Sequence, residues 1–305
     1  MLISIVIPAY NEESNIIALY DKIDTVLIGY EYEVIFIDDG STDNTLDVLK
    51  ALCRQHSNCH YISLSRNFGH QNALKAGIDY AKGDAVAMMD ADLQHPPELL
   101  IMMIEKWQEG YDIVYTQKKE DKSRNFLKRE ISNIVYSLIN KISDIKIEPN
   151  ASDYRLVDSA IAKIIKNNTE SNLFIRGITS WLGFKQYKIV YNPSKRFSGT
   201  PKYTFGKLAA LGLNGITSSS VRPLRFSAIC GAVISFLAFL YALYAIYIKL
   251  FTNEEIVGWA SVLVSVLFIG GLQLIMLGII GEYIGKVFIQ SKQRPNYIIS
   301  ESELD

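Results

Sequence analysis

The chain has 305 residues, of which 31 are Lys or Arg and 32 are Asp or Glu, and its formal net charge is −1. This near-neutral balance argues against a strongly basic surface for nucleic acid or another polyanion. The three cysteines fit no zinc or haem spacing, and an odd number cannot form a closed set of disulfides. The counts therefore favour reduced thiols in a protein that faces the cytosol.

The first 115 residues alternate between predicted strands and predicted helices. The strands are short apolar runs at 2–7, 33–37, 60–64, 84–89 and 111–115. The helical patterns lie at 13–27, 41–55, 70–83 and 97–107. Near-continuous apolar strands that alternate with helices predict a parallel sheet covered on both faces. In such a sheet the ligand site lies beyond the carboxyl ends of the strands.

Polar residues collect at three of these strand ends. The first strand leads into "PAYNEE" (8–13), the second into "DDGSTD" (38–43) and the fourth into "DADLQ" (90–94). Neither the glycine-rich dinucleotide fingerprint nor the P-loop pattern occurs in the sequence. A sheet of this class that binds phosphate without a glycine-rich cradle needs another positive group, and a divalent metal is the obvious substitute.

The "DADLQ" stretch is the predicted metal site. On an extended segment, residues two apart share a face, so Asp90, Asp92 and Gln94 are expected to point together. Their oxygen atoms are the ligands that Mg²⁺ and Mn²⁺ prefer. A bound cation would relieve the repulsion between the two carboxylates and neutralise a diphosphate. The alternative, a solvated acidic turn, is weakened by the two other acidic strand ends.

These motifs resemble a known family. The segments "SIVIPAYNEE", "VIFIDDGSTDNT", "SRNFGHQNALKAG" and "MMDADLQHPPE" are similar to those of glycosyltransferase family 2, whose GT-A fold enzymes use nucleotide-sugars. The later segments "ASDYRLVD", "FIRGITSWLGF" and "SKRFSGTPKYTFGKL" resemble polyprenyl-phosphate glycosyltransferases, a group that includes dolichol-phosphate mannose synthases and phage-type bactoprenol glucosyltransferases. The resemblance implies an α/β, Rossmann-like GT-A nucleotide-sugar domain followed by two C-terminal transmembrane helices.

The resemblance also implies roles for individual residues. Those that would bind the donor nucleotide are Pro8, Tyr10, Asn11, Glu12, Asp38, Asp39 and Asp90. Those near the reacting centre would be Asp153, Asp92 and Arg155, and the metal and donor diphosphate would be carried by Asp90, Asp92 and Gln94. Those that would hold the acceptor phosphate are Arg196, Lys202, Lys118, Arg124 and Arg129.

Several of these roles have alternatives. Asp38 can instead hold its own loop, and Asp153 can either abstract a proton or position the acceptor. The sequence departs from the family pattern at His95, where an Asp is frequent, and we interpret this His as structural. It departs again at Lys118, which stands where an Arg is common, so the bidentate fork of an arginine is missing there.

The C-terminal third predicts a membrane anchor. Residues 226–248 and 257–281 contain no charged side chain, and each segment exceeds the roughly 20 residues that a spanning helix needs. The connector between them carries Glu254 and Glu255. Basic residues flank the pair on its other side, at Arg222, Arg225, Lys286, Lys292 and Arg294. By the positive-inside rule, the N-terminal domain and the C-terminal tail are both expected in the cytoplasm.

The expected domain organisation follows from these segments. It comprises a nucleotide-sugar half (1–118), an acceptor half (119–203), an interfacial juxtamembrane segment (204–225), two transmembrane helices (226–289) and a cytoplasmic tail (290–305). The last five residues of the tail, "ESELD" (301–305), are acidic and are expected to be disordered. Glycines in the second span permit close helix approach and a homo-oligomer.

The resemblance implies inverting transfer of a hexose to a polyprenyl phosphate at the cytoplasmic face of the inner membrane. The first choice is glucose from UDP-glucose on undecaprenyl phosphate, with Mg²⁺ or Mn²⁺ and with a lipid-sugar flippase acting afterwards. Mannose from GDP-mannose, N-acetylglucosamine and a modified pentose remain alternatives. So does a processive polysaccharide synthase, although its usual Q-x-x-R-W signature is missing. A non-enzymatic scaffold would not need the acidic motifs, and a channel would need charged residues in the spans.

Overall fold

The computed structural model describes residues 1–119, 148, 151–171, 173–192, 221–251 and 258–304. The chain divides into two compact units. Among the described residues, the first unit contains everything up to 192 together with 293–304, and the second contains 221–251 and 258–292. The C-terminal residues thus belong to the same unit as the N-terminal domain, although the second unit lies between them in the sequence.

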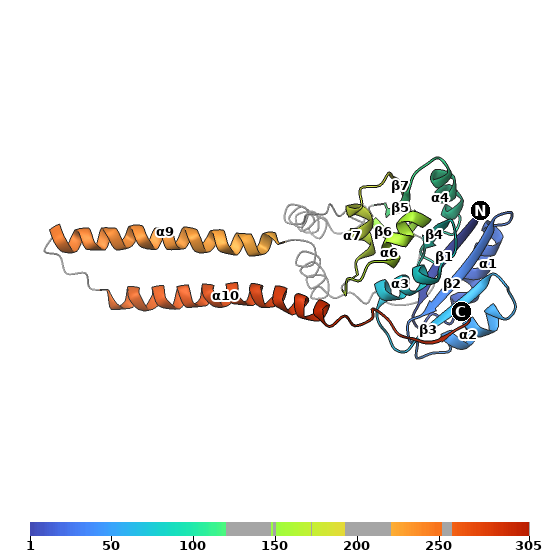
Figure 1. The fold of residues 1–305 in the computed structure, drawn as a ribbon, viewed down its shortest axis with the longest axis horizontal. Helices are drawn as coiled ribbons and strands as arrows, with labels where there is room; N and C mark the ends of the chain where they lie inside the picture. The colour runs from blue at the N-terminus through green and yellow to red at the C-terminus, as the bar shows by residue number, and fades with distance from the viewer. Residues whose placement is uncertain (120–147, 149–150, 172, 193–220, 252–257, 305) are drawn as a thin grey trace. The chain divides into compact units, whose positions relative to one another are not determined.

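An eight-stranded sheet forms the centre of the first unit (Figure 1). Its strands are β1 (Leu2–Ala9), β2 (Glu31–Asp38), β3 (Cys59–Leu64), β4 (Ala85–Met88), β5 (Ile113–Lys118), β6 (Ala151–Asp158), β7 (Gln186–Tyr191) and β8 (Ile299–Ser302). Their order across the sheet is β7-β5-β6-β4-β1-β2-β3-β8. All five strands expected from the sequence are present, as β1 to β5.

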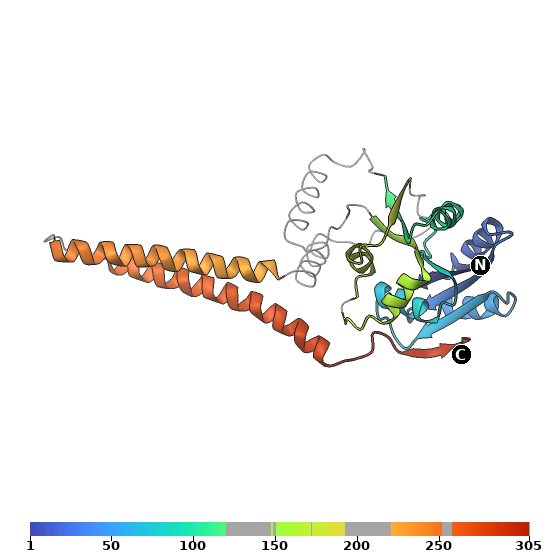
Figure 2. The ribbon, with the colours of Figure 1, turned by 45° about the horizontal axis from the view of Figure 1, so that its top comes forward.

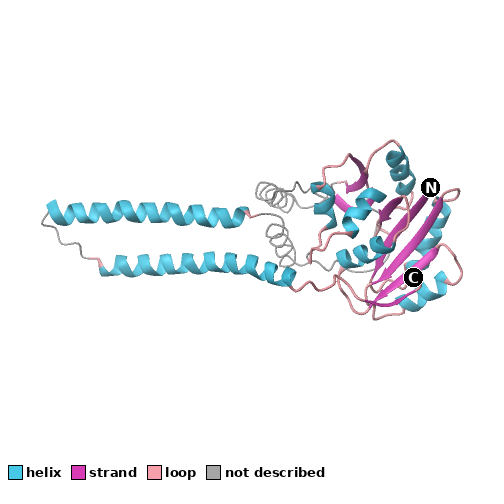
Figure 3. Ribbon diagram, in the orientation of Figure 1, coloured by secondary structure: helices cyan, strands magenta, loops and turns pink. Residues whose placement is uncertain are grey.

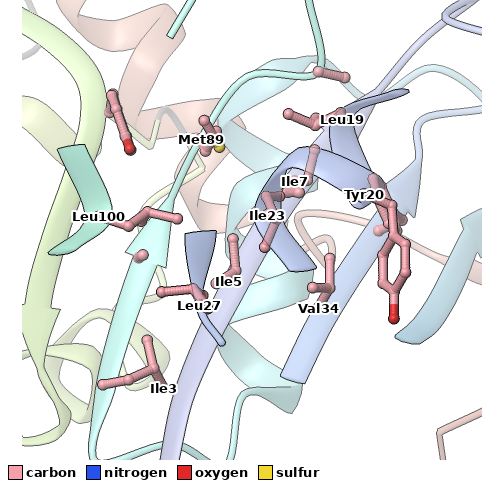
Figure 4. Close-up of a cluster of buried hydrophobic side chains, with 14 of the residues drawn as sticks. Ile3, Ile5, Ile7, Leu19, Tyr20, Ile23, Leu27, Val34, Met89 and Leu100 are labelled. Carbon is pink, nitrogen blue, oxygen red and sulfur yellow. The ribbon is translucent and has the colours of Figure 1, made fainter. Parts of the chain in front are cut away.

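Helices cover both faces of the sheet, as expected (Figure 3). The helices are α1 (Ile16–Val26), α2 (Thr45–Cys53), α3 (His70–Tyr80), α4 (Leu99–Gln108), α6 (Ser159–Lys166) and α7 (Ile175–Trp181). One buried cluster joins the sheet to α1, α2 and α4. It includes Ile3, Ile5 and Ile7 of β1 together with Leu19 and Ile23 of α1 (Figure 4). A second cluster joins the opposite face to α3, α6 and α7.

The sheet is mixed, so the expectation of a parallel sheet is only partly confirmed. Strands β1 to β4 pair in parallel, as do β5 and β7. Strand β6 is antiparallel to both β4 and β5, and β8 is antiparallel to β3. Because β6 runs backwards, its amino end lies at the edge of the sheet where β4 and β5 have their carboxyl ends. This places residues of β6 at the expected ligand site.

The C-terminal tail forms the edge strand β8, which includes Glu301 and Ser302 of the segment expected to be disordered (Figure 2). Its backbone pairs with β3, and the Ser65 amide donates to the Ile298 carbonyl at 2.9 Å. Side chains add to this: Tyr297 donates its hydroxyl to Asp79 at 2.8 Å, and Lys50 pairs with Glu301 at 2.6 Å. These contacts cover the edge of β3, which would otherwise expose unpaired backbone groups.

The second unit contains two long apolar helices, α9 (Arg222–Phe251) and α10 (Trp259–Ser291). In α10 most of the described apolar side chains are exposed, including Leu267, Phe268 and Leu274 at 65–70%. A core helix of a soluble domain would bury such residues. Within the described residues, the stretch Val264–Ser291 alone is long and apolar enough to cross a membrane, while Ser227–Tyr241 of α9 is a shorter apolar stretch.

Removing residues 296–305 tests whether the tail stabilises the first unit. The truncation deletes several hydrogen bonds, each worth about 1 kcal/mol net, so we expect the unfolding midpoint to fall by roughly 5–10 °C. Thermal unfolding of the detergent-solubilised chain measures this. In the control, Glu301→Gln removes the charge of the partly exposed pair with Lys50 but leaves an amide oxygen that can accept from the Tyr61 hydroxyl, so it should cost less than about 1 kcal/mol. A truncated chain that melts with the full-length protein would show that β8 adds nothing.

Candidate active site

The candidate site lies where the carboxyl ends of β1, β2 and β4 meet the amino end of β6. Strands β1, β2 and β3 follow one another in one direction across the sheet, and the chain then crosses back so that β4 lies on the other side of β1. The boundary between β1 and β4 is therefore the topological switch point of the sheet. Ligands of open α/β sheets bind in the crevice outside such a point.

The loop after β1 is fastened to the loop after β2. Asn11 has φ = 56°, a left-handed conformation that few residues adopt, and its side-chain oxygen accepts from the Thr42 amide at 2.8 Å. Its own amide donates to Ser41 Oγ at 3.0 Å. The Glu12 amide donates to Thr45 Oγ1 at 2.9 Å, and Tyr10 is 39% exposed beside it. The segment expected to bind the donor nucleotide thus has a fixed backbone and an exposed aromatic ring.

The two aspartates at the end of β2, Asp38 in its last position and Asp39 directly after it, are buried and hold loops. Asp38 accepts from the Ser41 amide at 3.1 Å and from Ser63 Oγ at 3.0 Å, which matches its alternative role of holding its own loop. Asp39 accepts from the amides of Phe68 and Gly69 at 2.7 and 3.0 Å. Burial raises the pKa of the Asp39 carboxyl, and these two amides oppose the rise. Pro8 is also buried, in β1.

The "DADLQ" segment is a turn, and the extended conformation predicted from the sequence is wrong. Strand β4 ends at Met88, and residues 91 and 92 form a turn. Leu93 has φ = 58°, which is a rare conformation for a branched apolar residue. The Asp92 carboxylate accepts from the Gln94 amide at 3.1 Å. Strained backbone of this kind is found at functional sites, and here the turn, rather than the strand, sets the directions of the carboxylates.

His95 holds this turn against β6 and is structural, as interpreted from the sequence. It is fully buried, its ring stacks on Tyr154, and its Nε2 lies 2.9 Å from Ser152 Oγ. Its Nδ1 accepts from the Asp90 amide at 3.4 Å. Burial lowers the pKa of His95, so the ring is neutral, with the proton on Nε2. Ser152 and Tyr154, two even-numbered residues of β6, thus lie on the face of the strand that contacts His95.

The odd-numbered residues of β6 face α7, and there Asp153 meets Arg176. Arg176 Nε donates to Asp153 Oδ1 at 2.8 Å and Nη2 donates to Oδ2 at 2.7 Å, while Nη1 donates to the Ala151 carbonyl. The Asp153 side chain is 13% exposed. Burial would raise the pKa of Asp153, but the hydrogen bonds from Arg176 and His70 outweigh it and hold the pKa well below its usual range.

His70 connects Asp153 to Asp90 of the "DADLQ" turn. It opens α3, and its Nε2 lies 3.4 Å from Asp90 Oδ1 and 3.6 Å from Asp153 Oδ2. Burial acts to lower the pKa of His70, but the neighbouring carboxylates Asp153 and Asp90 prevail and raise it. No role for His70 or Arg176 was predicted from the sequence. Both stand in quoted motifs, "SRNFGHQNALKAG" and "FIRGITSWLGF", which were the available signal.

Among the cations expected at the acceptor phosphate, Lys118 is the one within the described residues. It ends β5, and its Nζ donates to Gln94 Oε1 at 3.4 Å, which brings it beside the "DADLQ" turn. Arg155, expected near the reacting centre, lies on the same strand face as Asp153 but is buried, at 3% exposure. The remaining four, Arg124, Arg129, Arg196 and Lys202, lie outside the described residues.

The donor set suits a hard divalent cation that is shared with a substrate. No group of three or more His, Cys, Asp and Glu side chains in the described part of the chain is arranged to hold a metal. Mg²⁺, however, is usually held by one or two carboxylates, with waters and substrate phosphates completing the shell. Asp90, whose side chain is 32% exposed, and Asp92 supply two carboxylates at the switch point. These residues therefore fit a metal–diphosphate site.

The model of the family described as glycosyl transferase family 2 matches residues 4–195. The chain belongs to glycosyl transferase family 2. The match runs from Ser4 of β1 past β7 and leaves out β8, and it includes Asp90, Asp92, Asp153 and Arg176. The mixed sheet and the polar strand ends agree with the GT-A-like α/β fold of the family. The protein is accordingly a glycosyltransferase.

Relatives match along nearly the full chain. One is the "Uncharacterized glycosyltransferase YkcC" of Bacillus subtilis, 41% identical over 98% of this chain and 93% of its own. Another is the "Bactoprenol glucosyl transferase" of Shigella phage SfV, 42% identical over 99% of each chain. Among solved structures, glucosyl-3-phosphoglycerate synthase from Mycobacterium tuberculosis, in complex with Mn²⁺ and UDP-glucose, is 20% identical, with a TM-score of 0.48 over 71% of this chain and 77% of its own.

Arg176→Met tests the charge pairing in this glycosyltransferase. An acid with a lowered folded pKa stabilises the protein above its unfolded pKa, and this contribution is lost as the pH falls toward the folded pKa. We therefore expect the variant to lose on the order of 2 kcal/mol of unfolding free energy at about pH 7. The loss should shrink below the ordinary Asp153 value of 3.8. Chemical denaturation at several pH values measures it.

Arg54→Met, at the exposed end of α2, serves as the control for removing an arginine and should show no such pH dependence. An equal loss in both variants at every pH would mean that the Arg176–Asp153 pair contributes nothing through charge.

Proposed function

We propose that this glycosyltransferase transfers a hexose, with inversion, from a nucleotide-sugar to a polyprenyl phosphate. Glucose from UDP-glucose and undecaprenyl phosphate are the first choices. The observation that carries the proposal is the 42% identity to a bactoprenol glucosyl transferase over 99% of both chains, which extends through the C-terminal helices. A relative that shared only the nucleotide-sugar domain would give no information about a lipid acceptor.

Asp90, Asp92 and Gln94 would hold Mg²⁺ or Mn²⁺, which would neutralise charge on the diphosphate leaving group. Pro8, Tyr10, Asn11, Glu12 and Asp39 would bind the nucleotide, with Asp38 acting through its loop. The fixed backbone of Asn11 and the exposed ring of Tyr10 support this assignment. A nucleotide bound to a rigid loop has less motion to lose, which favours a defined position for the anomeric carbon.

The geometry favours a positioning role for Asp153 over proton abstraction. A phosphate monoester has a second pKa of about 6, so the acceptor is mostly a dianion near neutral pH and is already a nucleophile. Asp153 is held ionised by Arg176 and His70, and its pKa is lowered by them, so it is a poor proton acceptor. A fixed negative charge there would instead stabilise positive character on the sugar ring in the transition state.

The acceptor phosphate needs cations that hold it in line with the sugar. Lys118, beside the "DADLQ" turn, is suited to this task. The four arginine and lysine side chains outside the described residues, Arg124, Arg129, Arg196 and Lys202, remain candidates for it. Arg155 contributes a further positive charge next to Asp153.

The tail supports a membrane topology with two spans. Strand β8 follows α10 in the sequence, yet it pairs with β3 of the first unit. The chain must therefore leave and return on one side of the bilayer, which requires an even number of crossings. If α10 crosses, as its length and composition allow, α9 supplies the second crossing. The basic flanks then orient the active site and both termini toward the cytoplasm.

Two partners follow from this topology. A flippase would carry the glycosylated lipid across the membrane, and a homo-oligomer would form through the C-terminal helices.

Incubation with undecaprenyl phosphate, a divalent metal and labelled UDP-glucose tests the reaction. We expect lipid-extractable label with Mg²⁺ or Mn²⁺ and none when a chelator is added. The transfer rate of Asp92→Asn should be lower by at least about 100-fold, because groups that stabilise charge on a leaving group contribute on this scale. UDP-N-acetylglucosamine and GDP-mannose run in parallel identify the sugar. Product from none of the three donors, in a protein that still binds nucleotide with metal, would contradict the proposed acceptor or donor.

Asp153→Asn separates positioning from proton abstraction. We expect kcat to fall by about 10- to 100-fold while the acidic limb of the pH–rate profile stays near pH 6, because that limb reports protonation of the lipid phosphate. The measurement is kcat/KM for the lipid between about pH 5 and pH 9 in both proteins. Disappearance of the acidic limb in the variant would instead identify Asp153 as the general base.

A further inference from the structure

A cavity of about 190 Å³ lies on the odd-numbered face of β6, between β5, β7 and α7. Its walls include Tyr115 of β5, Arg155 of β6, Arg176 and Ser180 of α7, and Gln186 of β7. Ser180 is exposed and Arg155 is buried, so the cavity leads from the surface inward. Nothing in the donor-binding or metal-binding assignments uses this space.

Among the described residues, Arg155 is a buried cation to which no carboxylate is hydrogen-bonded. Its Nη1 donates to Thr179 Oγ1, and its Nη2 donates to the Ser152 carbonyl at 2.9 Å. Its Nε is buried and has no hydrogen-bond partner among the residues that the structure describes. Neutral partners do not balance its charge, and burial lowers the pKa of its guanidinium to about 10. Buried charges in proteins are normally paired, so an unpaired one beside a cavity indicates that the partner is a ligand.

The other charges around the cavity leave this excess uncancelled. Arg176 is neutralised by its bidentate contact with Asp153. Glu148, also in the wall, is paired with Lys188 at 3.3 Å. The positive charge of Arg155 therefore remains as the net charge of the lining that the described residues form. An oxyanion is the ligand that such a lining favours.

The position of the cavity relative to Asp90 indicates which oxyanion would bind in it. Asp90 contacts His70, His70 contacts Asp153, Asp153 contacts Arg176, and Arg176 lines the cavity. The cavity and the metal-site aspartates thus lie at opposite ends of one chain of contacts, with Asp153 between them. The donor diphosphate belongs at the Asp90 end. A second phosphate at the Arg155 end would approach the sugar from the side away from the leaving group, as inversion requires.

We propose that the cavity is an oxyanion subsite that receives the phosphate group of the acceptor, with Arg155 as its buried cation. This inference rests on the proposed function for the identity of the acceptor, while the oxyanion subsite itself rests on the geometry of the cavity. No proton is transferred at the subsite, since an arginine in this role acts as a fixed donor and charge.

Arg155→Met is the decisive variant, because it keeps the side-chain volume and removes the charge. A subsite arginine predicts a KM for polyprenyl phosphate at least tenfold higher, an unchanged KM for the nucleotide-sugar and a folded protein. Replacing a buried charge by an apolar group of similar size is often neutral for stability, so the unfolding midpoint should be retained. Arg54→Met is the matched control and should change neither KM.

An acceptor KM that stays at the wild-type value would overturn the inference. So would a rise in both KM values together with a lower melting temperature, since that pattern indicates an arginine needed only for folding. If Arg155→Met does not fold, Ser180→Leu narrows the exposed end of the cavity without touching the guanidinium. It should raise the acceptor KM alone, and an unchanged KM there would again contradict the subsite.

Inorganic phosphate separates the subsite from the proposed function. In a chelator, which removes metal-dependent binding at Asp90 and Asp92, phosphate should raise the melting temperature of the wild-type chain but not that of Arg155→Met. This shift is expected even if no polyprenyl phosphate is glycosylated, in which case the proposed function fails and the oxyanion subsite stands. In the transfer assay phosphate should compete with the lipid. Competition with the nucleotide-sugar, or no shift in either protein, would overturn the inference.

Discussion

The ion pair between Asp153 and Arg176 fixes the geometry on which the candidate site depends. Two hydrogen bonds of 2.7–2.8 Å orient the carboxylate, and a third bond from Arg176 reaches the backbone of β6 itself. The pair joins β6 to α7, and His70 extends it from Asp153 to Asp90. A partly buried carboxylate without this arginine would be protonated or poorly placed, because burial alone raises its pKa.

The sheet topology makes this pairing available. A fully parallel sheet would carry the amino end of β6 to the opposite edge, far from the carboxyl end of β4. Because β6 runs antiparallel between β4 and β5, Asp153 and Asp90 reach the same edge from opposite chain directions. Strand β8 lies along the side of the sheet and pairs with β3. Its Ser300 Oγ donates to the carbonyl of Ser63, whose hydroxyl in turn donates to Asp38. The tail therefore supports the loops of the donor side.

The sequence predicted β1 to β5 well, because each is an apolar run between polar ends whose burial decides its conformation. It did not predict β8, since "ISES" is short and polar and becomes a strand only by pairing with β3. The acidic strand ends were found from their spacing, but the turn at Leu93 was missed because D-x-D-x-Q also fits an extended strand. Arg176 stands in the motif "FIRGITSWLGF", but its pairing with Asp153 could not be predicted, since the partner is 23 residues away and meets it through tertiary structure.

The protonation state of Asp153 is the measurement that tests its positioning role most directly. Infrared difference spectra of the wild-type chain and Asp153→Asn, recorded from about pH 8 downward, isolate the signal of this one carboxyl group. We predict an ionised carboxylate at every pH above the ordinary value of 3.8, because Arg176 and His70 stabilise the charge. A protonation step near neutral pH would contradict a fixed charge and indicate a group that accepts a proton in the reaction.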